Sequence, residues 1–176
     1  AKQGGKLRFW SAGCSTGQEP YSLALTILSE MPDARGHDIR ILATDISSTV
    51  LETARAGRYT AEEVEDVPQE MRARWMERNG EHYVVDDAVR ALVSVKQLNL
   101  IESWPMKGPF DAIFCRNVVI YFEEATQVSI WRRMLPLLSA GGALYIGHSE
   151  RINGLPANSL ATAGITSYVK SVQAAA

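Results

Sequence analysis

Short runs of apolar residues alternate along this chain with segments whose apolar positions recur every three to four residues. The runs Leu7–Ala12, Ile39–Thr44 and Phe110–Cys115 predict buried strands, while Gln18–Met31 and Ser47–Ala56 show the helical period. Strands that are apolar almost throughout fit a parallel sheet that helices cover on both faces. The pattern therefore predicts an α/β protein with a doubly wound, mostly parallel sheet.

The two N-terminal helices carry recognisable end signals. Pro20 lies in the first turn of the first helix, where its missing N–H costs nothing. In the second helix, Thr49 and Glu52 have the spacing of a capping box, and Gly57 is expected to end the helix. These signals support the predicted helix bounds.

The C-terminal third continues the alternation. Glu123–Leu138 is predicted to be a helix that bends or ends near Pro136. A turn at Gly141-Gly142 would lead into a strand at Ala143–Ile146, and Thr166–Lys170 would form a terminal strand. This part therefore adds one helix and two strands to the fold.

The stretch Arg58–Gln97 is more polar than the rest and is predicted to be an insertion. It holds an expected helix at Pro68–Arg78 and short strand-like runs at His82–Val85 and Leu92–Lys96. The acidic run Glu62–Asp66 is most simply a solvated helix face. We expect these elements to form a small antiparallel β-subdomain.

The length suits a single domain. A chain of 176 residues can bury one full core and is too short for two ordinary ones. We expect residues 7–170 to form the domain, with the insertion at about 58–97. Residues 1–6 are expected to be a linker or a remnant of expression cloning, and residues 171–176 a tail.

Composition and charge exclude several classes of function. With 46% hydrophobic and 22% charged residues, the chain has the composition of a soluble globular protein. A net charge of −2 without a dense Lys/Arg cluster, and no apolar run long enough to span a bilayer, argue against nucleic-acid binding and membrane insertion. The distant Cys14 and Cys115 indicate a reducing compartment and no metal site. We therefore expect a cytoplasmic protein.

Small or polar residues follow three of the predicted strands. These are Gly13–Gly17, Asp45 and Arg116-Asn117, in chain order. Ligands of doubly wound folds bind at the carboxyl ends of strands, so we expect the three groups to share a crevice. The glycines would let a flat ligand approach the backbone, although a Gly-x-x-x-Gly loop by itself is more often an ordinary turn.

Asp45 and Glu19 indicate which cofactor fits this crevice. A carboxylate that closes the second strand can accept both hydroxyls of a ribose, or it can cap the next helix. Glu19 would repel a pyrophosphate but suits the ammonium and sulfonium of S-adenosylmethionine (SAM), and it also complements the helix dipole. These residues favour SAM over a nicotinamide dinucleotide, an alternative that rests on fold similarity alone.

Longer motifs resemble one family. They are similar to motifs of the CheR family, the chemotaxis receptor glutamate methyltransferases. They occur in the same order as in that family, and the resemblance runs from about Leu7 to Lys170. The segments that carry the resemblance are Phe9–Ser22, Ala43–Ser47, Ala56–Tyr59, Gly108–Phe122 and Gly147–Glu150.

The resemblance implies a Rossmann-like class I methyltransferase fold, with SAM as cofactor, S-adenosylhomocysteine (SAH) as product and no metal. It implies that Arg116 and Tyr121 position the reacting groups as catalytic residues, through charge and a hydroxyl donor. It also implies a set of cofactor contacts, made by Gly13, Glu19, Asp45, Asn99, Leu100, Arg116 and Asn117.

The implied reaction forms methyl esters on glutamate side chains of chemoreceptor cytoplasmic domains, as part of chemotaxis adaptation. A glutamate side chain has a pKa of about 4.3 and is already ionised at neutral pH, so no strong general base is required. Some members of the family dock a receptor's C-terminal peptide at the small β-subdomain, which makes such a peptide a second expected partner.

Two features depart from the family pattern. No N-terminal helical domain and no linker with a Thr-x-Phe-Phe-Arg motif precedes Leu7, and Gln18 stands where many relatives have Glu. An alternative expectation follows: a fragment that binds SAM or SAH, or docks on a receptor, with little activity of its own.

Overall fold

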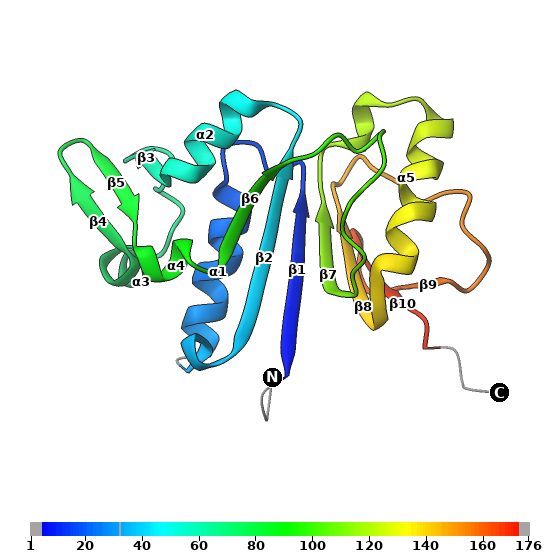
Figure 1. Ribbon diagram of the computed structural model, residues 1–176, viewed down its shortest axis with the longest axis horizontal. Helices are drawn as coiled ribbons and strands as arrows, with labels where there is room; N and C mark the ends of the chain where they lie inside the picture. Colours follow the sequence, from blue (N-terminus) through cyan, green and yellow to red (C-terminus); the bar gives the residue numbers. More distant parts are fainter. Residues whose placement is uncertain (1–4, 32, 173–176) are drawn as a thin grey trace. The chain divides into compact units, whose positions relative to one another are not determined.

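The computed structural model of this protein describes residues 5–31 and 33–172, and its chain divides into two compact units. The first unit comprises Ala1–Leu7 and Cys14–Gln97, and the second comprises Arg8–Gly13 and Leu98–Ala176. Figure 1 shows the helices and strands of both units, coloured along the chain.

The first unit holds the helices and strands from α1 to β6. Its helices are α1 (Gln18–Glu30), η1 (Ala34–Gly36), α2 (Ser48–Ala56), α3 (Gln69–Trp75) and α4 (Asp87–Arg90). Its strands are β2 (Asp38–Asp45), β3 (Arg58–Thr60), β4 (Met76–Asn79), β5 (His82–Val85) and β6 (Val93–Gln97). Both α1 and α2 contact β2 and β6, so the apolar helix faces predicted from the sequence pack on these two strands.

β2 and β6 form a parallel pair, in which Ile41 lies opposite Val93 and Asp45 opposite Gln97. The run Leu92–Lys96 was expected to belong to the antiparallel element of the insertion. It lies in a parallel strand instead, because its hydrogen-bonding partner is the buried strand β2, far earlier in the chain. Both strands therefore end at the same edge, where Asp45 lies.

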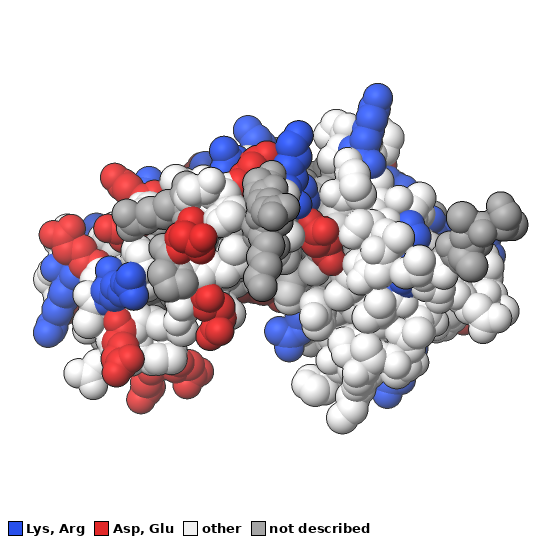
Figure 2. Space-filling model, turned by 90° about the horizontal axis from the view of Figure 1, so that it is seen from below, with Lys and Arg blue, Asp and Glu red and all other residues white. Residues whose placement is uncertain are grey.

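The remaining strands of this unit form a small antiparallel sheet in the order β3-β5-β4 (Figure 1). Such a sheet was predicted from the sequence, but of its strands only β5 was among the expected runs. The helix expected at Pro68–Arg78 ends at Trp75, because Met76–Asn79 pairs with β5 as an edge strand. The acidic run Glu62–Asp66 lies in turns and not on a helix, with Val64 buried at its centre. Acidic and basic side chains are interspersed over this part of the unit (Figure 2).

The start of α2 differs from the prediction, whereas its end agrees. Gly57 takes a left-handed conformation with φ of 58° and ends the helix. The predicted capping box of Thr49 and Glu52 is wrong, because Ser47 is the N-cap residue and Thr49 already lies inside the first turn. Asp45 lies two residues before this N-cap, and its Oδ1 accepts a 3.0 Å hydrogen bond from the Ser47 N–H.

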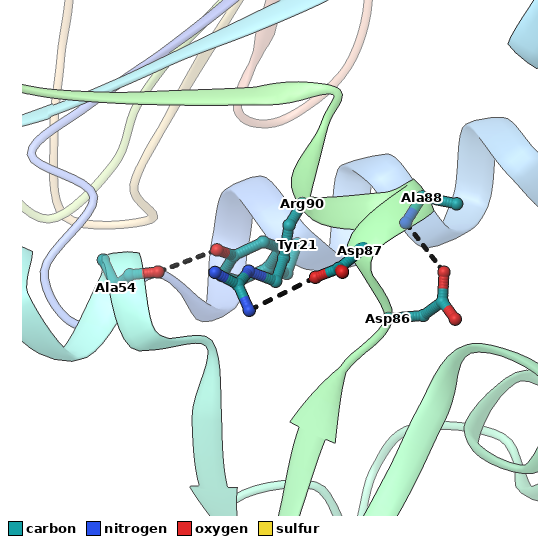
Figure 3. Close-up of polar contacts among 6 residues, drawn as sticks. All are labelled: Tyr21, Ala54, Asp86, Asp87, Ala88 and Arg90. Atoms are coloured by element: carbon teal, nitrogen blue, oxygen red, sulfur yellow. Dashed lines mark hydrogen bonds and ion pairs between the residues drawn. The ribbon is translucent and has the colours of Figure 1, made fainter.

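Side chains tie the helices of this unit to each other and to the chain around them (Figure 3). The buried Tyr21 of α1 donates a 2.7 Å hydrogen bond to the carbonyl oxygen of Ala54, in the last turn of α2. Asp86 accepts a 2.7 Å hydrogen bond from the Ala88 N–H and so caps α4. The Tyr21–Ala54 bond fixes the end of α2 against α1.

The second unit contains the first strand from Arg8 onward, and the chain that follows residue 97. Its strands pair in the order β1-β7-β8-β10-β9; β1, β7 and β8 are parallel, and β10 is antiparallel to both of its neighbours. The elements are β1 (Lys6–Ala12), β7 (Phe110–Cys115), η2 (Val119–Tyr121), α5 (Glu124–Leu137), β8 (Leu138–Ile146), β9 (Leu160–Thr162) and β10 (Ser167–Lys170). A mixed sheet with a parallel core and packed helices confirms the predicted fold class.

Two glycine- and proline-dependent predictions in this unit had different outcomes. Pro136 lies in the last turn of α5, which ends at Leu137, as expected for a residue that cannot continue a helix. Gly141, with φ of 73°, was expected to lie in a turn before a strand. It lies within β8, which already begins at Leu138. The pairing of β8 with β7 shifts register there, and the positive φ of the glycine permits this irregularity.

Aromatic residues fill the core of the second unit. Trp10 is fully buried and packs edge-on against Trp104, with ring centroids 5.1 Å apart. The ring centroid of Phe110 lies 5.7 Å from that of Trp10. Trp131 of α5 is also buried, and its Nε1 donates to the carbonyl oxygen of Arg151 at 3.2 Å. Burial of each such side chain contributes on the order of 2 kcal/mol, which makes this cluster the anchor of the unit. Among the described residues, no helix is long and apolar enough to cross a membrane.

Candidate functional site

Asp45, the last residue of β2, is the centre of the candidate site in the first unit. Its Oδ2 accepts a 2.9 Å hydrogen bond from the Ser15 N–H, and its Oδ1 accepts one from the Ser47 N–H at 3.0 Å. Asp45 therefore does not cap α2, the alternative that the sequence left open, because its Oδ1 binds the N–H of the N-cap residue itself and its Oδ2 binds a different loop. An ionised carboxylate has about four acceptor positions, so two remain for a ligand while the group is held in one orientation.

The loop between β1 and α1 is fixed to β2 by its backbone. The Cys14 N–H donates to the carbonyl oxygen of Thr44 at 2.8 Å, and Ser15 has a left-handed backbone with φ of 49°. These features turn the Ser15 N–H toward Asp45. The structure thus brings together the loop and the acidic residue that the sequence predicted to be neighbours.

Gly17 is the N-cap residue of α1, with φ of 97°. A Cβ at this position would lie 2.9 Å from both the Ala54 Cβ and the Tyr59 hydroxyl. That hydroxyl donates a 2.8 Å hydrogen bond to the carbonyl oxygen of Thr16. The glycine is therefore required by close packing against α2 and β3, a reason that the spacing Gly-x-x-x-Gly did not reveal.

Burial keeps two titratable groups near this loop neutral. Burial raises the pKa of the Cys14 thiol to about 12, and the charge of Asp45 adds to the effect. Burial likewise raises the pKa of the Tyr59 hydroxyl. Both groups therefore act as packing and hydrogen-bonding elements at neutral pH, where Cys14 is held as the thiol and not as the reactive thiolate.

Glu19 and Ile46 complete the chemistry of the first unit. Glu19 lies half-buried in the first turn of α1, as predicted. Ile46, directly after Asp45, is 61% exposed, and its carbonyl oxygen accepts a 2.8 Å hydrogen bond from the Gln97 Nε2. Sequence reasoning missed Ile46. The available signal was a large apolar residue directly after the strand-closing carboxylate.

In the second unit, Gly13 is the residue directly after β1. Its φ is 80°, and a Cβ there would overlap the Val118 side chain. The space above this glycine is therefore filled by Val118, and Gly13 provides room for protein packing where the sequence suggested room for a flat ligand.

The loop after β7 carries Arg116 and Asn117, both exposed. Asn117 is left-handed, with φ of 59°. A Cβ on Gly147 would lie 2.9 Å from the Asn117 nitrogen, so Gly147 allows the strand end of β8 to approach this loop closely. Asn117, the second residue of the predicted pair, is thus held in an unusual backbone conformation near the carboxyl end of β7.

Glu150 is buried beneath this loop, with 2% of its surface exposed. Its Oε1 accepts hydrogen bonds from the N–H groups of Val118 (2.8 Å) and Val119 (2.9 Å). Its Oε2 accepts from Asn117 (3.1 Å) and Gly147 (2.5 Å). The sequence placed Glu150 in a family motif but indicated no role for it, because its partners at 117–119 lie far from it in the chain.

Asn99 and Leu100 lie in a loop that Arg133 of α5 holds. The Arg133 guanidinium donates to the carbonyl oxygens of Leu100 (3.0 Å) and Ile101 (3.2 Å), and also to that of Glu102. It also stacks 3.9 Å from the centroid of the Trp104 ring. The Leu100 side chain is buried, and the Asn99 side chain helps to hold the same loop, because its Nδ2 donates to the Glu102 carboxylate at 3.1 Å and its Oδ1 accepts from the Ile101 N–H at 3.0 Å.

Tyr121, the predicted catalytic tyrosine, is 81% exposed at the end of η2. A tyrosine on the surface of a short 3₁₀ segment has little packing to lose. Its hydroxyl is therefore open to a large partner such as another protein.

The donor set suits SAM better than a metal. Among the described residues, no group of three or more His, Cys, Asp or Glu side chains could hold a metal ion. Asp45 offers oriented acceptors for ribose hydroxyls, Glu19 a carboxylate for an ammonium, and Ile46 an exposed apolar surface for an adenine ring. The residues present in the first unit therefore fit a sulfonium nucleoside.

Comparison with known proteins agrees with this chemistry. Residues 1–169 match the family model described as "CheR methyltransferase, SAM binding domain". The chain is 51% identical over 172 residues to a probable chemotaxis protein methyltransferase of Rhizobium etli, with 96% of this chain and 64% of the relative covered. It is 42% identical over 159 residues to the chemotaxis protein methyltransferase of Escherichia coli, with 88% and 55% covered. The chain thus spans roughly half to two thirds of these relatives.

Solved structures of low identity share the fold. PKMT2 from Rickettsia typhi, determined in complex with AdoHcy, has a TM-score of 0.51 at 19% identity, with 80% of this chain and 20% of that chain covered. The DszA carbon methyltransferase has a TM-score of 0.52 at 18% identity, with 83% and 29% covered. At these identities the likeness supports the architecture alone.

Proposed function

Because this chain belongs to the family of CheR methyltransferase SAM-binding domains, we propose that it is the catalytic domain of an enzyme that methylates chemoreceptor glutamates. Family membership confirms the resemblance inferred from the sequence motifs, and with it SAM as the cofactor. The proposed substrate is the cytoplasmic domain of a chemoreceptor, so the enzyme would act in the cytoplasm, in chemotaxis adaptation.

The orientation of Asp45 is the observation that carries the cofactor assignment. Two backbone N–H groups hold its carboxylate at the end of β2, at 2.9 and 3.0 Å. We propose that the remaining acceptor positions bind the ribose hydroxyls, and that Glu19 binds the amino group of the methionine part. A carboxylate that is already oriented loses little freedom on binding, which favours affinity.

Other predicted residues are proposed to add cofactor contacts. They are Gly13, Asn99, Leu100, Arg116 and Asn117. For Gly13 and Leu100 these contacts would come from the backbone, because Val118 fills the space above Gly13 and the Leu100 side chain is buried.

The chain's own work in the reaction is binding and alignment. Bound SAM supplies an electrophilic methyl group, whose transfer to a carboxylate oxygen leaves SAH and a methyl ester. The substrate carboxylate arrives ionised, so the protein needs no base to remove a proton. We propose that the charge of Arg116 and the exposed hydroxyl of Tyr121 orient the carboxylate, and that this alignment accounts for much of the rate.

The small antiparallel sheet is the proposed docking place for a receptor C-terminal peptide. In the order β3-β5-β4, β4 is an edge strand of four residues, Met76–Asn79. Edge strands offer unpaired backbone groups to which an extended peptide can add. Arg72 and Arg74 of α3, the helix that leads directly into β4, supply positive charge for a terminal carboxylate. Chemical-shift changes confined to β3 on adding such a peptide would refute the choice of β4.

Two measurements test the proposed enzyme. Calorimetric titration with SAH should show saturable one-site binding by the purified chain. With SAM and a receptor cytoplasmic fragment, base treatment of the product should release volatile methanol, the signature of a methyl ester. Binding without methanol release would favour the alternative of a binding fragment, and absence of SAH binding would refute the cofactor assignment.

A further inference from the structure

We infer that Glu150 is a positioning residue, whose buried carboxylate holds the backbone of residues 117–119 so that Arg116 and Asn117 are presented to the cofactor. The inference rests on the proposed function, since it assigns a task to a residue outside the predicted cofactor and catalytic set. It depends only on contacts within the second unit.

The geometry around Glu150 is that of an anion held by the backbone. The N–H groups of three consecutive residues, Asn117 to Val119, donate to its two oxygens at 2.8–3.1 Å. Consecutive N–H groups can converge on one anion only where the chain curls, and the left-handed Asn117 provides that curl. The fourth donor, the Gly147 N–H, comes from the end of β8 and ties it to the same carboxylate.

Burial makes these hydrogen bonds effective. With 2% of Glu150 exposed, water competes little for either oxygen. Burying a carboxylate carries a desolvation cost, which an apolar side chain at this position would avoid. A charge at this position is explained if a specific loop conformation, and not core stability alone, is what the residue provides.

Loss of the Glu150 carboxylate would remove the order of the loop that carries Arg116 and Asn117. Without the carboxylate, the three N–H groups would have no common acceptor, and residues 117–119 would relax toward a more ordinary backbone. Arg116 and Asn117 come directly before or at the start of this curl, so their side chains would lose their fixed direction. Cofactor affinity should fall because these residues would have to be ordered on binding.

The substitution Glu150→Gln tests the inference with minimal change in shape. The amide keeps one acceptor oxygen, but its NH₂ group would face two N–H donors with which it cannot bond. We expect calorimetric SAH affinity to fall at least tenfold. We also expect amide hydrogen exchange at residues 117–119 to speed up by more than any change measured elsewhere in the unit. If the Gln variant does not fold, Glu150→Asp, which keeps the charge but moves it by one methylene, is read in the same way.

Asp111→Asn is the matched control. The Asp111 Oδ2 also accepts a backbone N–H, from Arg8 at 2.8 Å, but it lies near the start of β7, at the opposite end of the strand from Arg116. This variant should keep SAH affinity within twofold of wild type, even if its unfolding temperature drops as much as that of Glu150→Gln. Equal loss of affinity in both variants, or normal affinity and exchange in Glu150→Gln, would overturn the inference. A wild-type chain that does not bind SAH would instead refute the proposed function.

Discussion

The backbone N–H of Ser15 lies 2.9 Å from the Oδ2 of Asp45, and this bond joins the loop after β1 to the end of β2. The loop and the acidic residue are separate motifs in the sequence, and the hydrogen bond makes them one structural element. It also fixes the carboxylate before any ligand arrives, which is how a small loop can contribute affinity.

Asp45→Ala should weaken SAH binding at least about 100-fold, which corresponds to roughly 3 kcal/mol. The variant loses the acceptors proposed for the ribose and leaves the Ser15 N–H without its partner. Calorimetry measures the change, and Glu52→Ala, which removes an exposed carboxylate from α2, should bind normally. Unchanged affinity in Asp45→Ala would remove the ribose assignment.

Gly17→Ala should lower the free energy of unfolding by about 3 kcal/mol, through left-handed strain and overlap with Ala54 and Tyr59. Urea denaturation gives the value. Gly36→Ala is the control, because a Cβ there meets nothing within 4 Å, and it should be nearly neutral. Similar losses in both variants would argue against the packing explanation.

Stability should fall in alkaline solution because of Cys14. Its pKa is about 12 in the folded protein and 9.0 ordinarily, so between these values the unfolded thiol loses its proton while the folded one keeps it. Unfolding then becomes easier as the pH rises, by up to about 1.4 kcal/mol per pH unit. Below pH 9 the stability difference between wild type and Cys14→Ala should be constant, and above it the difference should shrink. A difference that stays constant to pH 12 would contradict the predicted linkage.

Tyr121→Phe should separate binding from transfer. The side chain is 81% exposed, so thermal stability and SAH affinity should remain those of the wild type. The turnover number for methyl ester formation should drop at least about tenfold, since the hydroxyl proposed to donate to the substrate carboxylate is lost. Unchanged turnover would show that the hydroxyl takes no part in the reaction.

Arg133→Lys should cost about 2 kcal/mol of stability, because an ammonium cannot bond three carbonyl oxygens and stack on Trp104 together. Arg132→Lys is the matched control on the same helix. Arg132 is exposed and donates to the carbonyl oxygen of Gly154 at 2.9 Å, so its substitution should be close to neutral. Equal unfolding midpoints for the two variants would count against the loop-holding role of Arg133.

Local patterns in the sequence predicted the elements that depend on local chemistry. The apolar runs became β1, β2 and β7, and Gly57 and Pro136 mark helix ends as expected. Each of these features depends on neighbours in the chain, which periodicity and backbone preference report directly.

Features that depend on distant partners could not be predicted. The run that became β6 was misplaced because its pairing strand, β2, precedes it by several elements. Helix α3 was expected to be longer because nothing local shows that Met76 and the residues after it pair with β5. Glu150 is the strongest case. Its place in a motif does not show that its carboxylate accepts four backbone N–H groups, three from residues 117–119 and one from Gly147.

The hydrogen bond from the Tyr59 hydroxyl to the Thr16 carbonyl has a consequence for engineering. Tyr59 is the middle residue of β3, so a strand of the small sheet supports the loop beside Asp45 directly. A chimaera that grafts another relative's small sheet onto this scaffold must therefore keep a tyrosine at this position. Trimming the sheet away to obtain a minimal nucleoside-binding core would remove that support, so the insertion is not a detachable module.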